Sequence, residues 1–251
     1  MKAFTTTRNG GVSTGNYATF NANHYCGDNP DNVAANRQLL CKELGIDQQN
    51  LIIPHQTHGT NILTIDDTFL ALPQEQRADR LENIDALITN KPRVAICVST
   101  ADCVPILIYD TKNHAAASIH AGWRGTVGRI AEHALTAMQT QYATNPTDCI
   151  AIIGPSISVD SFEVGTEVYE QFQAAGFNMA EIAQKQDKWH IDLWQCNRMQ
   201  LTDKGILLHN IQTANICTYL HTDTFFSARR LGIKTGRMLT GIVLDMEKHC
   251  P

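Results

Sequence analysis

The chain has 251 residues, enough for one large domain or two small ones at about 150 residues per domain. Hydrophobic residues make up 43% of it and charged residues 18%, a composition that excludes wholesale disorder. The formal net charge of −5 argues against a general nucleic-acid binder, because such a protein is expected to carry a basic face.

Neither the N-terminus nor any apolar run indicates secretion or membrane insertion. Residues 1–8 lack the apolar segment of a signal peptide. The best apolar runs, such as Val104–Tyr109, are strand-sized and far below the roughly 18 residues of a membrane span. We therefore expect a cytoplasmic protein that contacts no membrane, with its eight cysteines reduced. No Cys-x-x-Cys pair occurs, so zinc ribbons and thioredoxin-type sites are unsupported.

The first half of the chain predicts one helix followed by short strands. Asn29-Pro30 is typical of a helix start, and this helix is expected to run to Leu44 and end at Gly45. A strand at Leu51–Pro54 comes next, and Pro73–Asn83 is either a loop or a short solvated helix. Short apolar runs then predict four buried strands. These are Asp85–Thr89, Val94–Val98, Pro105–Tyr109 and Ala115–His120.

The second half predicts more helices and a C-terminal hairpin. Apolar residues at helical spacing indicate a helix over Gly125–Tyr142. A strand at Ile150–Ile153 and helices at Glu163–Ala175 and Asp192–Lys204 follow. Phe225–Leu244 resembles a hairpin that turns at Gly232 or Gly236. Because strands cluster rather than alternate strictly with helices, and no linker interrupts the chain, we expect a single α/β domain over residues 1–251, with a mixed sheet covered by helices.

Three segments place reactive side chains where an apolar run meets a loop. They are His55–Gly59, Thr100–Pro105 and Ser118–Thr126. Catalytic and binding groups collect at such junctions, because the strand fixes the backbone while the loop leaves the side chain reachable.

Cys103 and His120 flank a predicted strand hairpin, so an antiparallel return brings them together although 17 positions separate them. His58 would complete a His/Cys/His set. Three protein ligands with a water in the fourth position are the pattern of catalytic zinc. The metal would keep Cys103 as a thiolate and lower the pKa of its bound water to about 7.

Simpler interpretations of these residues remain open. A lone cysteine is more often a core residue than a ligand, and lone histidines are more often hydrogen-bonded structural residues. Cys103 and His120 could instead be a metal-free nucleophile and base. Asp102 is either a catalytic base or a cap that accepts hydrogen bonds from local backbone amides.

Three arginines are candidates for binding phosphate or another part of a substrate. Arg8 precedes a flexible Asn-Gly-Gly turn, Arg124 lies in a Gly-Trp-Arg-Gly loop before a predicted helix, and Arg229 lies in Ser-Ala-Arg-Arg. Guanidinium groups and helix N-termini both suit anions. Each arginine taken alone is more typical of a surface residue or an ion pair.

These motifs resemble the YfiH/YlmD family, also called the laccase-domain or polyphenol oxidase family and, more recently, purine nucleoside phosphorylases. The resemblance runs from Phe4 to about Leu244. The matching segments include Thr7–Ser13, Gln56–Gly59, Asp85–Leu87, Ala101–Pro105, His120–Thr126, Gly154–Ile157, Phe226–Arg230 and Gly236-Arg237.

The resemblance implies α/β/α layers and a zinc site made of His58, Cys103 and His120. It also implies phosphorolysis of adenosine, inosine, guanosine and methylthioadenosine, together with adenosine deamination, so purine nucleosides and phosphate are the expected partners. Two positions depart from the family pattern. His55 offers an extra or substitute ligand, and Ala228 stands where tyrosine is commoner.

The leading hypothesis is a zinc-dependent purine nucleoside phosphorylase with adenosine deaminase activity, in which Cys103, His120 and Asp102 are the catalytic candidates. A copper-dependent polyphenol oxidase is less favoured, because none of the ten histidines forms a His-x-His pair. The third hypothesis is a Cys-His hydrolase that acts on amide bonds of cell-wall precursors. The fourth is a binding module without catalytic activity.

Overall fold

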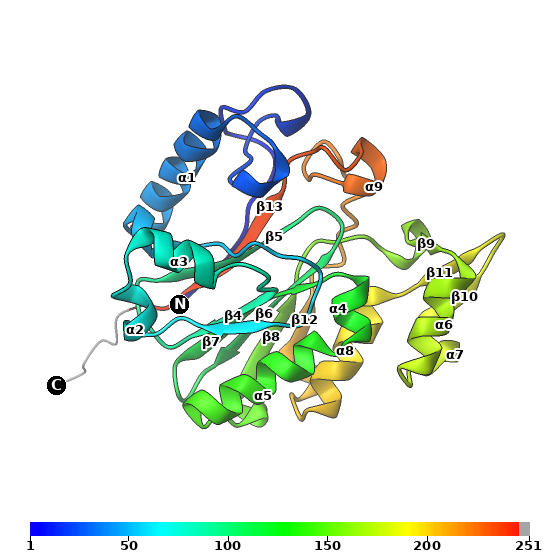
Figure 1. Ribbon diagram of the computed structural model, residues 1–251. Coiled ribbons are helices and arrows are strands. Elements are labelled where there is room, and N and C mark those ends of the chain that lie inside the picture. Colours follow the sequence, from blue (N-terminus) through cyan, green and yellow to red (C-terminus); the bar gives the residue numbers. More distant parts are fainter. Residues whose placement is uncertain (246–251) are drawn as a thin grey trace.

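The computed structural model describes residues 1–245, and its strands form three sheets (Figure 1). The six-stranded sheet has the order β12 (Ile211–Thr213), β8 (Cys149–Ile153), β6 (Val104–Asp110), β7 (Ala115–Ala121), β4 (Ala86–Thr89) and β3 (Ile62–Thr64). The four-stranded sheet has the order β1 (Lys2–Thr5), β13 (Met238–Val243), β5 (Ala95–Thr100) and β2 (Leu51–Ile52). The small sheet has the order β10 (Ala183–Lys185), β11 (Trp189–Ile191) and β9 (Glu163–Val164).

Both large sheets are mixed. β12 and β3 pair parallel to their neighbours at the two edges of the six-stranded sheet, while its inner pairs are antiparallel. In the four-stranded sheet β2 pairs parallel to β5 and the other two pairs are antiparallel. The expected mixed strand directions are confirmed.

Helices lie outside the sheets and in the connections. They are α1 (Pro30–Leu44), α2 (Asp67–Leu70), α3 (Gln74–Arg80), α4 (Trp123–Val127), α5 (Ile130–Tyr142), α6 (Thr166–Ala174), α7 (Met179–Ile182), α8 (Leu193–Asp203) and α9 (Ala228–Leu231). Short 3-10 helices occur at Gly15–Tyr17, His24–Cys26, Gln48–Asn50, Pro146–Asp148, Val159–Ser161 and Leu208–Asn210. Within residues 1–245, none of the helices combines the length and the apolar character needed to cross a membrane.

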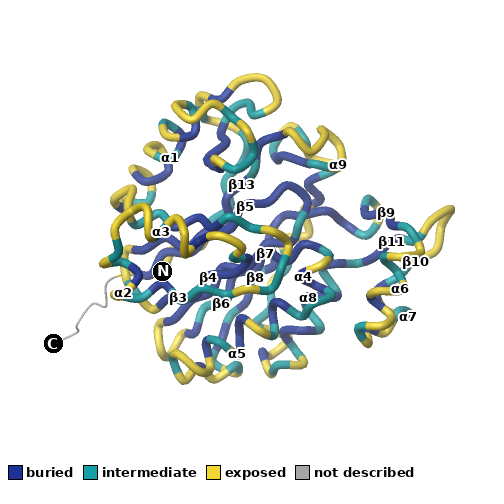
Figure 2. The backbone as a smooth tube through the Cα atoms, in the orientation of Figure 1, coloured by how far each residue is buried: buried dark blue, intermediate teal, exposed yellow. Residues whose placement is uncertain are grey.

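The two large sheets pack face to face. Ile96 and Ile242 of the four-stranded sheet share one buried cluster with Leu87 and Leu107 of the six-stranded sheet. The outer face of the four-stranded sheet packs on α1, whereas α5 and α8 cover the outer face of the six-stranded sheet (Figures 1 and 2). The α/β class is therefore confirmed with one correction: two sheets, not one, lie between the helix layers. Continuous apolar strands show only that both faces are covered, and a second sheet covers a face as well as a helix does.

The first predicted helix is confirmed as α1. The Asn29 side chain accepts a hydrogen bond from the backbone amide of Asp31, and Pro30 stands in the first turn. Gly45 ends the helix with a φ of 70°, a left-handed conformation that glycine adopts without strain. The four central strands, β4 to β7, lie where their apolar runs predict them, and the helix predicted over Asp192–Lys204 is confirmed as α8, with Asp192 as its N-cap.

Two predicted helices have different bounds. The helix expected over Gly125–Tyr142 is broken into α4 and α5 between Val127 and Ile130, where Arg129 has a φ of 60°. A Cβ at Gly128 would lie 2.7 Å from Thr60, so the break brings the chain close to the loop that follows β2. The helix expected from Glu163 begins only at Thr166, because Glu163 and Val164 pair with β11.

The C-terminal hairpin prediction is wrong. β13 pairs with β1 and β5, which lie far away in the sequence. Phe226 is buried outside any strand, and Ser227 caps the short helix α9 by accepting a hydrogen bond from the amide of Arg230. Of the two alternatives for Pro73–Asn83, the short solvated helix is correct, as α3.

Leu107 is 3% exposed and lies in the cluster between the two large sheets. We therefore expect that shortening its side chain strongly destabilises the fold. Leu107→Ala should lower the free energy of unfolding by about 2–5 kcal/mol, because the cavity left behind adds to the lost burial. Leu208→Ala is the matched control, since this leucine is 62% exposed and should change stability by less than about 0.5 kcal/mol. Urea denaturation followed by circular dichroism measures both variants, and equal effects would contradict the layer assignment.

Candidate metal centre and active-site cavity

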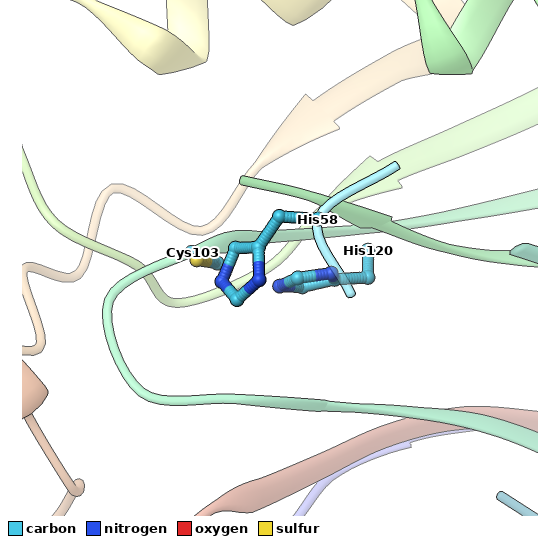
Figure 3. A group of neighbouring side chains, drawn as sticks. All are labelled: His58, Cys103 and His120. Atoms are coloured by element: carbon cyan, nitrogen blue, oxygen red, sulfur yellow. The ribbon is translucent and has the colours of Figure 1, made fainter. Parts of the chain in front are cut away.

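His58, Cys103 and His120 meet at one end of the β6–β7 pair (Figure 3). Pro105 pairs with His120 and Val104 with Ala121, so Cys103, immediately before β6, lies beside the end of β7. His58 reaches the same point from the loop after β2. The possible ligand atoms of the three side chains all lie within 4.8 Å of one another, and the rings of His58 and His120 are 4.9 Å apart between centroids. The expected proximity of Cys103 and His120 is confirmed.

Two residues of the site have left-handed backbone conformations. His58 has a φ of 64° and Asp102, the neighbour of Cys103, has a φ of 89°. Non-glycine residues rarely adopt this left-handed region, and such strain concentrates at functional sites. A Cβ at Gly122 would lie 3.0 Å from the His58 ring and 3.1 Å from the Cys103 sulfur. Glycine at position 122 therefore leaves room for the two side chains to meet.

Asp85 bonds the backbone of His58 and the side chain of His120. This residue precedes β4, is fully buried, and accepts hydrogen bonds from the backbone amides of His58 and Gly59 at 2.9 and 2.8 Å. Its carboxylate also accepts a 2.8 Å hydrogen bond from His120 Nδ1. Burial alone would raise the pKa of Asp85, but the hydrogen bond and charge of His120, together with the backbone amides, lower it below its usual value. A carboxylate on Nδ1 leaves Nε2 of His120 for a metal or for Cys103.

The surroundings favour a thiolate at Cys103. Burial opposes ionisation of the thiol, but the charges and hydrogen bonds of His120 and His58 outweigh it and lower the pKa of Cys103 to about 6. Burial also disfavours a charged His120, but Cys103 and Asp85 raise the pKa of His120 to about 9. A thiolate is both the metal-binding and the nucleophilic form of cysteine.

A cavity of about 220 Å³ opens beside the three side chains and is bordered by all of them. The Thr100 side chain also borders it; its hydroxyl is buried and has no hydrogen-bond partner among residues 1–245. Gln56 closes one side through hydrogen bonds in both directions with the backbone of Ser99, at 2.8 and 2.7 Å. The cavity therefore lies directly beside the three possible metal ligands.

The Asp102 carboxylate is used elsewhere. One of its oxygens accepts a 2.7 Å hydrogen bond from the Thr218 hydroxyl, and the other accepts a 2.7 Å hydrogen bond from the backbone amide of Arg229. Neither partner is a local backbone amide of the kind considered from the sequence, because Thr218 and Arg229 lie 116 and 127 positions away. Asp102 thereby anchors the loop that carries Cys103 to the first turn of α9.

The three arginines singled out from the sequence have other partners. Arg8 donates hydrogen bonds to the carbonyls of Ala18 and Thr222. Arg229 donates to the carbonyl of Glu163, and Arg124 is exposed with its guanidinium over the Trp123 ring.

Among the described residues, the arginine that borders the cavity is Arg237, whose guanidinium donates to the carbonyls of Ile233 and Gly236. Sequence reasoning missed Arg237, Asp85 and Thr100 as site residues. All three residues lie within or beside the segments that carry the family resemblance, and that position could have marked them as site residues.

His55 borders the cavity but is not part of the metal group formed by the described residues. Its Nδ1 donates a 2.6 Å hydrogen bond to the Glu82 carboxylate. Its ring stacks on Tyr25 with 4.2 Å between centroids and 12° between planes. The geometry does not favour the extra-ligand role considered for His55.

Comparison with known proteins gives the same family along the whole described chain. Residues 2–245 match the family described as multi-copper polyphenol oxidoreductase laccase. A purine nucleoside phosphorylase of Bacteroides thetaiotaomicron is 51% identical over 96% of this chain and 90% of its own. Adenosine deaminase RL5, from an unknown prokaryotic organism, is 43% identical over 96% of this chain and 93% of its own.

The crystal structure of YlmD from Geobacillus stearothermophilus superimposes with a TM-score of 0.90 at 30% identity, covering 97% of this chain and 92% of that one. A purine nucleoside phosphorylase of Escherichia coli named YfiH is 35% identical over 97% of this chain and 94% of its own. Sequence, family match and fold agree, and the chain belongs to the YfiH/YlmD family.

Proposed function

We propose that the protein is a zinc-dependent purine nucleoside phosphorylase that also deaminates adenosine. The observation that carries the proposal is the convergence of His58, Cys103 and His120 on one cavity. Its support is 51% identity to a purine nucleoside phosphorylase and 43% identity to an adenosine deaminase. Adenosine, inosine, guanosine and methylthioadenosine are the proposed nucleosides, with phosphate as the second substrate.

The donor set fits zinc. Two imidazoles and one thiolate are the ligand types that zinc prefers, and three protein ligands leave a position open for catalysis. The buried Asp85 carboxylate accepts a hydrogen bond from Nδ1 of His120. Metal-binding histidines usually donate their second ring nitrogen to such a group. When bound, zinc would supply a Lewis acid and would lower the pKa of a coordinated water to about 7. We propose His58, Cys103 and His120 as its ligands.

Another cavity residue is suited to binding phosphate. Arg237 places a permanent positive charge on a wall whose side chains include no carboxylate, a setting suited to phosphate. We therefore move the proposed phosphate contact from Arg8, Arg124 and Arg229 to Arg237, because Arg237 is the arginine that borders the cavity among residues 1–245.

The donor groups are a poor match to a multi-copper oxidase, despite the family's description. Oxidation of phenols coupled to oxygen reduction needs several copper ions to store electrons. Residues 1–245 hold one His/Cys/His group, and none of the ten histidines of the chain forms a His-x-His pair. The chemistry of the ligands therefore favours the phosphorylase.

A metal-free cysteine hydrolase is a second candidate, favoured by one observation. Cys103 contacts His120, and His120 contacts Asp85, so the three side chains form a row of nucleophile, base and orienting carboxylate. This is the logic of catalytic triads, and it would suit amide bonds of cell-wall precursors. His58 has no required part in such a triad, whereas zinc binding uses it.

The direct test of the proposed function is phosphate-dependent release of hypoxanthine from inosine by the purified, zinc-loaded protein. We expect hypoxanthine and ribose 1-phosphate in equal amounts, measured by chromatography. A chelator should abolish the reaction and added zinc should restore it. Release without phosphate would show hydrolysis of the nucleoside and contradict the phosphorylase, and activity on amide substrates that resists chelation would instead support the cysteine hydrolase.

Replacing the thiolate tests the metal ligands. Cys103→Ala leaves two neutral imidazoles for a divalent ion, so zinc affinity should fall by at least about 10–100-fold, the loss typical of an outer hydrogen-bonding partner. Phosphorolysis and deamination should disappear together. Cys97→Ala is the matched control, because Cys97 is fully buried in the middle of β5 and should affect stability alone. Metal content is measured by mass spectrometry, and full zinc occupancy of Cys103→Ala would refute the assignment.

Removing the charge of Asp85 tests its positioning role. Asp85→Asn keeps the size of the side chain but weakens the hydrogen bonds from His120 and the His58 loop. Zinc affinity should fall by about 10–100-fold, as measured by competition with a chromophoric chelator. Zinc affinity equal to that of the wild type in a folded Asp85→Asn protein would show that Asp85 acts only on folding.

A further inference from the structure

His55 is a cavity histidine that the proposed metal site does not use. Its side chain borders the same cavity as His58, Cys103 and His120, but it does not belong to their metal-binding group. The question is what a histidine beside the reacting groups does when it is not a ligand.

The ring of His55 is held from several sides. Backbone hydrogen bonds fix the residue, since its amide donates to the Leu81 carbonyl and its carbonyl accepts from the Ile84 amide. Nδ1 donates to the Glu82 carboxylate at 2.6 Å, and Tyr25 stacks against the ring. Nε2 is the ring nitrogen left without a hydrogen-bond partner within residues 1–245. A carboxylate that orients one nitrogen of an imidazole prepares the other nitrogen for proton transfer.

Phosphorolysis of a purine nucleoside requires a proton donor. When the bond between the ribose C1′ and the purine N9 breaks, the purine takes the electron pair and leaves as an anion unless N7 is protonated. Two other groups on the cavity wall that carry a proton are unsuited, because burial raises the pKa of both Tyr25 and Cys26. His58 and His120 would be occupied by the metal.

We propose that His55, oriented by Glu82, donates the proton to N7 of the departing purine; this proposal rests on the phosphorylase function proposed above. An oxygen of phosphate forms a bond to C1′ while the C1′–N9 bond breaks. The electron pair of that bond passes to the purine, and the Nε2 proton of the doubly protonated His55 ring passes to N7, which leaves a neutral ring whose Nδ1 still donates to Glu82. The products are ribose 1-phosphate and the neutral base, and solvent returns a proton to His55. The catalytic residue is His55, and Glu82 is a positioning residue.

The test compares inosine with 7-methylinosine. The methyl group on N7 already makes the base cationic, so 7-methylhypoxanthine leaves as a neutral molecule without a proton donor. His55→Gln should lower kcat for inosine by about 100-fold or more, the usual contribution of a general acid, and change kcat for 7-methylinosine by less than about threefold. Equal losses on both substrates, or no loss on inosine, would overturn the proposal.

His24→Gln is the matched control. His24 contacts Tyr25 with 3.7 Å between ring centroids, but it lies outside the wall of this cavity and borders a different one. Its replacement should leave both substrates unaffected. Zinc content and melting temperature of each variant show whether fold and metal site are intact.

Two further measurements keep the proposal testable if the wild type does not accept 7-methylinosine. Free imidazole should restore inosine phosphorolysis to His55→Gly, and absence of rescue would contradict proton donation. Glu82→Ala should lower kcat for inosine, whereas Glu82→Gln, whose amide oxygen still accepts from Nδ1, should recover most of it.

If the wild-type protein shows no phosphorolysis at all, the proposed function fails. If the wild type is active and His55→Gln matches it, only the role of His55 fails.

Discussion

The site depends on the hydrogen bonds that the buried carboxylate of Asp85 accepts. It accepts hydrogen bonds from the backbone of His58 and Gly59 and from the side chain of His120. These groups come from the loop after β2 and from β7, so one side chain sets the position of two candidate ligands. A buried carboxylate without such donors would be costly, because it would lose its hydration without compensation. The hydrogen bonds that satisfy Asp85 are the same ones that shape the site.

The packing of the two sheets supports the strands that carry the site. β6 and β7 lie in the middle of the six-stranded sheet and are buried almost throughout, with α5 on one face and the four-stranded sheet on the other. Side chains at the end of such strands have little freedom, and rigid support is what a catalytic centre needs. Asp102 extends this support by tying the Cys103 loop to Thr218 and to α9. The centre is therefore held by contacts from much of the chain.

The side chains that border the cavity differ in the chemistry to which they are suited. His58, Cys103 and His120 form the candidate metal group, and Arg237 contributes positive charge. His55 and Glu82 form a separate histidine–carboxylate pair on the same cavity. Two such pairs, His120 with Asp85 and His55 with Glu82, differ in burial. The first is almost fully enclosed, whereas both side chains of the second are more than a third exposed, as suits a group that exchanges protons with solvent.

The sequence by itself determined the local features of this protein. Pro30 and Gly45 marked the ends of α1, and the apolar runs marked the central strands, because capping and burial depend on neighbouring residues. A hairpin also brings its own ends together, so the meeting of Cys103 and His120 could be predicted. The tertiary structure alone decided that β13 joins β1 and β5, that two sheets stack, and that Arg237 rather than Arg8 borders the cavity. It also decided that Asp85 holds residues 27 and 35 positions away. Such contacts depend on how distant segments pack, and a local pattern of side chains reports that a residue is buried without reporting which residues bury it.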